Sequence, residues 1–391
     1  MAVWVAGCSL TDPEYVIGTS RQELQQGRGG SAGKQDTEDP KHLWVSAVEY
    51  PEGYDWQRDT AHGRVSCRLV LFRDGERQLE LPVREGVSPD PDMHRILGGH
   101  LYTEDCTASE TLICRDGEEL FRFAGREIIR GWLPGEEGSL HTLGQSRSGS
   151  GFSYRIQGEL KYTQPAGTVF GSPGSGPMRS GALYRDGTTV CFGYATNGGH
   201  FLLWRNGDEE EVFPQEPERV FDLRSVGGRS IAVYSNREDG LRLLAGEADY
   251  APASLLALNA RILPDGQGGF VLAVRYRDHD GYVQDAAVGE DGLRERFGGY
   301  GDRVELVPGM ETDSFVALDA QGKVAVISWK GRTDYPEAGR WRLMGPGCIL
   351  MNETDAWIAL TGPPPQAPAV WHGGEMTTLL MNGYLTGIAY E

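Results

Sequence analysis

Short runs of alternating apolar and polar residues fill this chain, and many of them end at a glycine turn. The recurring unit is an apolar run, one or two polar residues, a turn glycine and a second short run. Clear copies are LVLFRDGERQLEL around Gly75, LICRDGEELFRF around Gly117, SYRIQGELKY around Gly158 and LLWRNGDEEEVF around Gly207; weaker copies surround Gly246, Gly292, Gly331 and Gly373. Alternation with Gly, Asn or Asp at the turn predicts antiparallel hairpins.

The spacing of these glycines predicts the fold. Successive turn glycines lie 39 to 49 residues apart, which matches the roughly 40–50 residues of a four-stranded propeller blade. We find no long stretch with apolar residues at helical spacing. The expected fold is therefore all-β: an eight-bladed β-propeller of four-stranded antiparallel blades, forming a single domain over residues 1–391. If one weak unit is misassigned, the ring has seven blades.

The two ends of the chain predict how the ring closes. The first unit opens on AVWVAG (residues 2–7), which has the sequence of a second strand. The chain ends on GYLTGIAY (383–390), a first strand with no unit after it. We expect the C-terminal strand to complete the N-terminal blade, because closure removes exposed sheet edges. In the eighth unit, WRLMGPG (341–347) is the expected first strand.

Four segments carry a resemblance to a known family. They are Val3–Gly7, Phe72–Gly75, Leu203–Gly207 and Ser328–Gly331. VWVAG, followed by a strand ending in W-(K/R)-(N/D)-G, resembles bacterial β-propeller repeat proteins of the V-Y-V-A-G … W-K-N-G type. Members are mostly uncharacterised and often exported, so the resemblance implies a propeller and is compatible with export. It implies no particular chemistry.

Composition narrows the classes of partner. The net charge of −19 argues against binding nucleic acid by neutralising phosphates. No run of 18 apolar residues occurs, so we expect no membrane span. Val5–Cys8 resembles a lipoprotein processing box, but only seven residues precede Cys8, and a first strand is the favoured interpretation. The compartment stays open. A Cys8–Cys67 disulfide is conceivable, although buried free thiols are favoured.

Irregular insertions concentrate on one rim of the predicted ring. In a propeller, the second-to-third links within blades and the links between blades share a rim. The largest insertion is the loop 10–63 in the first blade, whose part 20–40 is polar and predicted to be flexible. Others are 167–180, 278–281 and the proline-rich 361–368, which we expect to lie beside the first insertion across the closure. Loops on a rigid scaffold commonly carry binding residues.

Aromatic residues in the second half of the large insertion are the candidate ligand-binding residues. They are Trp44, Tyr50, Tyr54 and Trp56, accompanied by several carboxylates. As a flap over the channel mouth they would offer apolar platforms for a sugar or a peptide. The alternative is a hairpin whose aromatic side chains pack on the blade edge.

A second candidate site is the turn DHDG at 278–281. Asp278, Asp280 and the later Asp285 supply oxygen ligands in an order that resembles a calcium-binding loop. The acidic residue at the twelfth position of such a loop is missing. The alternative is an ordinary Asp-Gly hairpin turn. Calcium is thus the one metal that the sequence suggests. No P-loop, dinucleotide fingerprint, G-x-S-x-G or HExxH motif occurs, so no other cofactor is expected.

Two functions follow from these observations. The first is a non-catalytic binding or interaction module that uses the loop-rich rim and channel mouth, its partner being a small molecule, a glycan or a protein. The second is a polysaccharide hydrolase or lyase with carboxylates gathered around the channel. The concentration of insertions on one rim favours the first.

Overall fold

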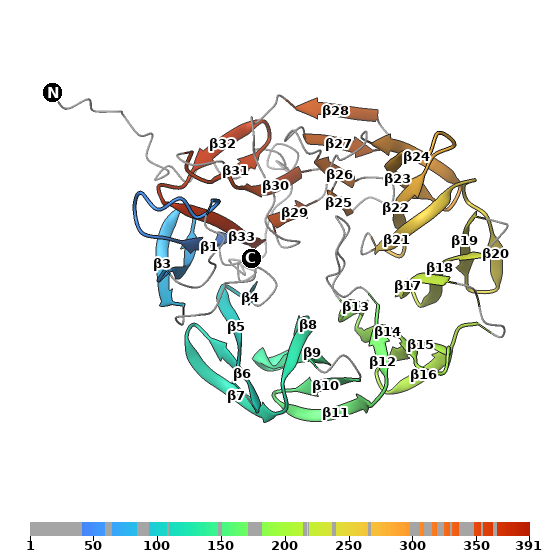
Figure 1. Ribbon diagram of the computed structural model, residues 1–391, viewed down its shortest axis with the longest axis horizontal. Coiled ribbons are helices and arrows are strands. Elements are labelled where there is room, and N and C mark those ends of the chain that lie inside the picture. The colour runs from blue at the N-terminus through green and yellow to red at the C-terminus, as the bar shows by residue number, and fades with distance from the viewer. Residues whose placement is uncertain are drawn as a thin grey trace, which may run out of the picture.

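The structure is a computed structural model in which antiparallel sheets surround a central axis (Figure 1). The residues it describes are 41–58, 65–83, 94–107, 109–147, 151–170, 182–213, 217, 219–236, 240–264, 267–297, 305–308, 315–318, 324–328, 331–335, 348–352, 355–362 and 366–391. In this part of the chain the strands form eight sheets, each a blade of the ring. The protein is a β-propeller, as the repeat predicts.

From the innermost strand outwards, the first four sheets have the following bounds. They are β33 (Gly383–Tyr390), β1 (Leu43–Glu49), β2 (Arg68–Arg73) and β3 (Glu76–Pro82); β4 (His94–Leu97), β5 (His100–Cys106), β6 (Glu110–Arg115) and β7 (Glu118–Ala124); β8 (Glu127–Pro134), β9 (Leu140–Ser146), β10 (Phe152–Ile156) and β11 (Glu159–Gln164); β12 (Gly167–Val169) with β13 (Tyr184–Asp186), then β14 (Thr189–Thr196), β15 (Phe201–Arg205) and β16 (Asp208–Glu211). A 3-10 turn, Glu136–Gly138, links β8 to β9.

The remaining four sheets are ordered in the same way. They are β17 (Arg219–Val226), β18 (Arg229–Asn236), β19 (Gly240–Ala245) and β20 (Ala248–Tyr250); β21 (Leu256–Pro264), β22 (Phe270–Arg277), β23 (Val283–Gly289) and β24 (Gly292–Phe297); β25 (Glu305–Pro308), β26 (Phe315–Leu318), β27 (Val324–Ser328) and β28 (Gly331–Tyr335); β29 (Ile349–Asn352), β30 (Asp355–Leu360), β31 (Ala369–His372) and β32 (Glu375–Thr378).

The repeated glycines lie where the pattern places them, between the third and fourth strands of each blade. Asp74 and Gly75 have φ angles of 49° and 83°, and Asp116 and Gly117 have 53° and 87°. Positive φ at both central residues defines the type I′ turn, whose twist suits a two-residue hairpin. Asp at the first position tolerates this region, and Gly enters it without steric cost.

The C-terminal strand pairs with the N-terminal blade, as expected. Strand β33 runs antiparallel to β1, with Leu43 opposite Tyr390 and Glu49 opposite Gly383. The blade therefore joins the last eight-residue strand of the chain to three strands from its beginning, and Figure 1 shows this blue and red sheet between its neighbours.

The strand that occupies the second position of this blade differs from the predicted one. That position belongs to Leu43–Glu49, not to AVWVAG at 2–7, which lies outside the described residues. The assignment of 43–49 to the loop 10–63 is therefore wrong, and the link from β1 to β2 begins only at Tyr50. Two alternating apolar runs precede β2, and the nearer run needs the shorter connection, which costs less loop entropy.

Two other first strands also depart from the prediction. In the fourth blade, β12 and β13 both pair with β14, so the first strand is interrupted, and Gly167–Val169 is strand rather than insertion. In the eighth blade, the first strand is Ile349–Asn352. The predicted WRLMGPG at 341–347 lies outside the described residues.

The hydrophobic core lies between neighbouring blades. One cluster joins Leu385 and Val45 of the closing blade to Ile358 and Trp371 of the blade before it. Another joins the sheet of β17–β20 to that of β21–β24. In both clusters, neighbouring blades bury apolar side chains against each other. The five described cysteines are free thiols, and Cys8 lies outside the described residues. No helix in the described segments is long and apolar enough to cross a bilayer.

Candidate functional site

A pocket of about 620 Å³ lies where the closing blade meets the blade of β29–β32, and we call it the seam pocket. Three links on one rim line it: Glu52–Trp56 after β1, Gln366 and Ala367 before β31, and Leu380–Asn382 before β33. These are second-to-third and blade-to-blade links, which the sequence places together on the loop-rich rim. Glu49 and Gly383 complete its wall.

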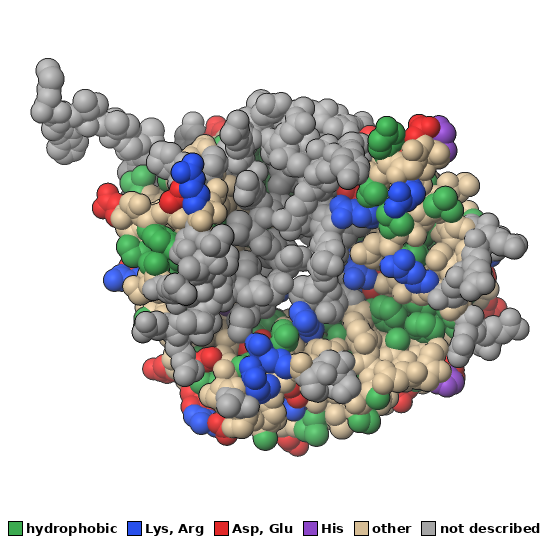
Figure 2. Space-filling model, viewed as in Figure 1, with side chains coloured by type: hydrophobic (Ala, Val, Ile, Leu, Met, Phe, Trp, Pro, Cys, Tyr) green, Lys and Arg blue, Asp and Glu red, His purple; other side chains and the backbone are tan. Residues whose placement is uncertain are grey.

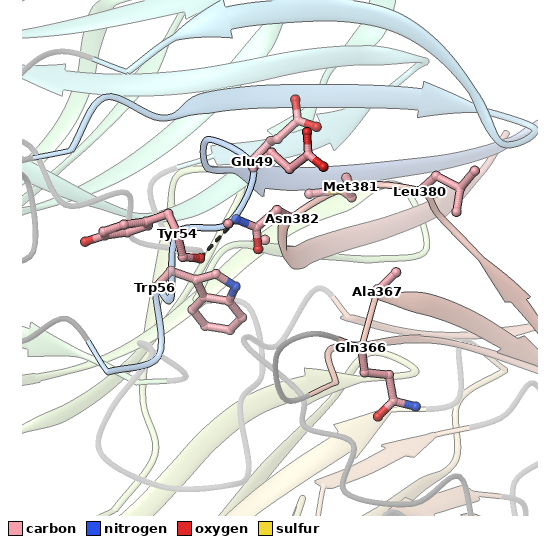
Figure 3. Close-up of a pocket in the computed structure, with 11 residues that line it drawn as sticks. Glu49, Tyr54, Trp56, Gln366, Ala367, Leu380, Met381 and Asn382 are labelled. Atoms are coloured by element: carbon pink, nitrogen blue, oxygen red, sulfur yellow. Dashed lines mark hydrogen bonds between the residues drawn. The ribbon is translucent and has the colours of Figure 1, made fainter. Parts of the chain in front are cut away.

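Hydrogen bonds hold the link after β1 against the link before β33. The Asn382 Nδ2 group donates to the Tyr54 carbonyl at 3.0 Å (Figure 3) and to the Pro51 carbonyl at 2.6 Å. The Tyr50 N–H donates to the Asn382 carbonyl at 2.8 Å. The Asn382 side chain thus fixes two carbonyls of the turn after β1. Because Asn382 directly precedes the closing strand β33, the shape of the pocket depends on closure of the ring.

A further bond brings in the proline-rich link. Gln57 Nε2 donates to the Gly362 carbonyl at 3.1 Å. The described part of segment 361–368 therefore lies beside the link after β1, across the closure, as the sequence analysis expects.

Three of the four predicted aromatic residues lie at this site. The Trp56 ring is 5.0 Å from the Tyr384 ring and stacks 6.4 Å from Tyr50, whose ring lies 5.4 Å from Tyr54. Trp56 and Tyr54 line the pocket, and Tyr50 packs beside Tyr384 in a small buried cluster. In Figure 3, Trp56 faces Gln366 and Ala367 across the pocket, while the Tyr54 ring points away from them.

Trp44 lies elsewhere, on strand β1. It packs against the buried cluster of Leu71, Ile96 and Leu101. A Cβ at Gly99, in the β4–β5 turn of the next blade, would come within 2.9 Å of the indole. The structure therefore brings Tyr50, Tyr54 and Trp56 together and separates Trp44 from them.

The pocket also has residues that the sequence analysis did not select. Leu380 is 89% exposed, whereas the neighbouring Met381 is 9% exposed. Strand β32 ends at Thr378, so Leu379 and Leu380 belong to the link before β33. Because Leu380 lines the pocket, its exposed side chain is available for contact with a ligand there. The sequence feature that could have pointed to Leu380 is the short link LLMN (379–382), which lies directly before the closing strand.

Two glutamates give the pocket its charge. Both oxygens of Glu49 accept hydrogen bonds from Arg77, the Nη1 bond being 2.8 Å long. The bond from Glu49 holds the pKa of Arg77 above its ordinary value, so the guanidinium stays charged. Glu52 is exposed in the link after β1. The pocket thus presents one neutralised carboxylate, one solvated carboxylate, an indole and aliphatic side chains.

The carboxylates of the predicted calcium turn have other roles in the structure. Asp278 Oδ1 accepts from the N–H groups of Asp280 and Tyr282, which shapes its own turn. Asp285, on β23, is buried and accepts two 2.9 Å hydrogen bonds from Arg275. Asp280 is exposed beside His279. No group of three His, Cys, Asp or Glu side chains suited to a metal ion occurs among the described residues. Calcium binding stays a prediction of the sequence pattern alone.

The chain has weak structural likenesses to known proteins. No family model and no curated protein sequence matches the chain. One similar solved structure is BBS1N in complex with ARL6DN, soaked with lead: TM-score 0.36, 13% identity, covering 70% of this chain and 86% of that chain. Another is the computationally designed Ika8 protein: TM-score 0.41, 9% identity, covering 72% of this chain and 84% of that chain. Neither likeness bears on what this chain binds.

Proposed function

We propose that this protein is a non-catalytic binding module that takes a peptide segment or a carbohydrate in the seam pocket. The observation that carries the proposal is Leu380, an 89% exposed leucine beside an aromatic-lined pocket of about 620 Å³. Pockets of about 300–1,000 Å³ with aromatic walls and a few polar groups are typical ligand sites. The Trp56 indole, backed by Tyr384, is a rigid platform for a sugar ring or an apolar side chain.

The rigidity of the site supports binding rather than simple exposure of a loop. The turn that carries Tyr54 is fixed by Asn382, and Gln57 ties the same link to Gly362. A pocket that is already formed loses little conformational entropy when it takes a ligand. Bacterial export, which the family resemblance suggests, would suit a glycan or peptide ligand and is part of the same proposal.

Leu380→Ser is the variant that tests this function. Because the side chain is exposed, the substitution is expected to leave the melting temperature of the free protein unchanged. We expect at least one member of a panel of oligosaccharides and blocked tetrapeptides to raise the melting temperature of the wild type, and to raise that of L380S less. The measurement is a thermal-shift titration.

Leu160→Ser is the matched control, because Leu160 is 51% exposed on the outer strand β11, in another blade. This variant should respond to the ligand as the wild type does. A panel that stabilises none of the proteins, or equal shifts in L380S and the wild type, would remove the seam pocket as the binding site.

The alternative function, a polysaccharide hydrolase or lyase, has one observation in its favour. Glu49 and Glu52 line the same pocket, and glycosidases use two carboxylates, commonly about 5–10 Å apart. The Arg77 pair occupies both Glu49 oxygens, which suits neither a general acid nor a nucleophile. Release of reducing sugar by the wild type, abolished in Glu52→Gln, would favour the enzyme over the binding module.

A further inference from the structure

A second pocket, of about 610 Å³, lies between the sheet of β17–β20 and the sheet of β21–β24. We call it the arginine pocket. Its lining comes from the start of β17, the end of β18, the start of β21 and the end of β22. These strand ends adjoin a second-to-third link and a blade-to-blade link, so this pocket opens on the same rim as the seam pocket but lies in other blades.

Two exposed arginines give this pocket its charge. They are Arg219 and Arg277, and the described residues of the lining include no Asp or Glu. Arg277 Nη1 donates to the Gly281 carbonyl at 3.1 Å, which uses one of the five N–H donors of the guanidinium. The Arg219 guanidinium lies 4.8 Å from the centre of the Phe221 ring. Both cations are thus positioned by the fold and still reach solvent.

An apolar surface lies directly beside one of these cations. Leu256 is 64% exposed and is the cross-strand partner of Arg277 in the β21–β22 ladder. Directly opposite residues of an antiparallel pair project from the same face of the sheet. Leu258 also lines the pocket, and Ser235 and Asn236 add hydrogen-bond donors. A ligand that fits has an anionic group and an apolar chain next to it.

The charge of the whole chain limits how many negative charges the ligand can carry. The net charge is −19, and Figure 2 shows Asp and Glu mainly along the outer edge of this face, with groups of Lys and Arg over β17, β21 and β22 and also over β8 and β9. The Debye length is about 8 Å at physiological salt. A polyanion would therefore meet the repelling edge, whereas a single carboxylate would interact mainly with the local arginines.

We propose that the arginine pocket binds a carboxylate end group that carries an apolar chain, supplied by the free C-terminus of a peptide. Arg219 and Arg277 would hold the carboxylate by charge-assisted hydrogen bonds, and Leu256 and Leu258 would contact the apolar side chains. This site is independent of the seam pocket and stands if the function proposed above fails.

The test is calorimetric titration of the full chain with N-acetyl-Gly-Leu-Leu as the free acid and as its C-terminal amide. We expect the free acid to bind at least about tenfold more tightly, in line with loss of one charge-assisted contact in the amide. The double variant Arg219→Gln/Arg277→Gln should lose this preference. Arg229→Gln, an exposed arginine paired with Glu290, should keep it.

Four results would overturn the proposal. Equal affinity for acid and amide would show that the carboxylate is not recognised. No binding of the acid at about 1 mM would remove the site. Binding of octanoate without binding of the peptide acid would replace the peptide by a fatty acid as the source of the carboxylate. An unchanged preference in the double variant would place recognition outside the arginine pocket.

Discussion

Replacing Glu127 by Gln is expected to lower the free energy of unfolding by about 3–5 kcal/mol. Glu127 on β8 accepts two hydrogen bonds from Arg155 on β10, at 2.6 and 2.9 Å, and both side chains are about nine-tenths buried. The Arg155 guanidinium also lies 3.9 Å from the centre of the Phe123 ring in the preceding blade. The substitution leaves a buried cation without its counter-charge, in a contact between two blades.

The control for this prediction is Glu119→Gln, whose partner Arg122 is exposed on the outer strand β7. Urea titration should give a clearly lower midpoint for E127Q and an unchanged midpoint for E119Q, at equal slopes. The double variant Glu127→Leu/Arg155→Met should regain part of the loss, because it leaves no unpaired charge. Equal midpoints for E127Q and E119Q would mean that the Glu127–Arg155 pair contributes nothing to the free energy of unfolding.

Replacing Leu385 by Ala is expected to cost about 2–5 kcal/mol. Leu385 is fully buried on the closing strand β33, in the cluster that joins this blade to the sheet of β29–β32. Its N–H donates to Thr361 Oγ1 at 3.1 Å. The substitution therefore leaves a cavity in the contact that holds the last strand of the chain in the ring.

Leu380→Ala is the matched control, since the same residue type lies five positions earlier and is 89% exposed. The free energy of unfolding should fall by less than about 0.5 kcal/mol in this variant. If L385A proved as stable as L380A, strand β33 would not contribute to the core, and the account of ring closure would fail.

The repeat in the sequence was sufficient to predict the architecture, because it rests on local turn chemistry. Asp74-Gly75 and Asp116-Gly117 adopt the φ values that a two-residue hairpin requires. A two-residue turn of this type determines that the two strands it connects pair with each other. That the C-terminal strand joins the N-terminal blade was also predictable, since an unpaired first strand at one end matched a missing first strand at the other, although the predicted partner was AVWVAG at 2–7 and not β1.

Two apolar runs, AVWVAG at 2–7 and LWVSAVE at 43–49, could each form the second strand of the first blade. The alternation of apolar and polar residues does not distinguish them, but a further feature of the sequence does. That feature is His42-Leu43. Asp74 accepts from the Leu43 N–H at 2.9 Å and bonds His42 Nδ1 at 2.6 Å. Asp116 makes the same two contacts with His100 and Leu101 in the next blade. His-Leu at the start of the second strand, with Asp before the turn glycine, therefore identifies 43–49.

The candidate site was predictable only in part. Aromatic enrichment identified Tyr54 and Trp56, but it also selected Trp44, because composition does not reveal that Trp44 belongs to a strand. Leu380 and Asn382 are more than 300 residues away from Tyr54 in sequence, and only the closed ring brings them together. Likewise, the pairing of Asp285 with Arg275 depends on the register of β22 and β23.

Amide hydrogen exchange of residues 383–390 tests the closed ring most directly. If β33 pairs with β1 along its length, its amides that bond to β1 should exchange as slowly as the paired amides of β21, the innermost strand of another blade, which likewise pairs on one side only. Exchange of these residues at the rate of a free C-terminal tail, with β21 still protected, would contradict the closure of the ring.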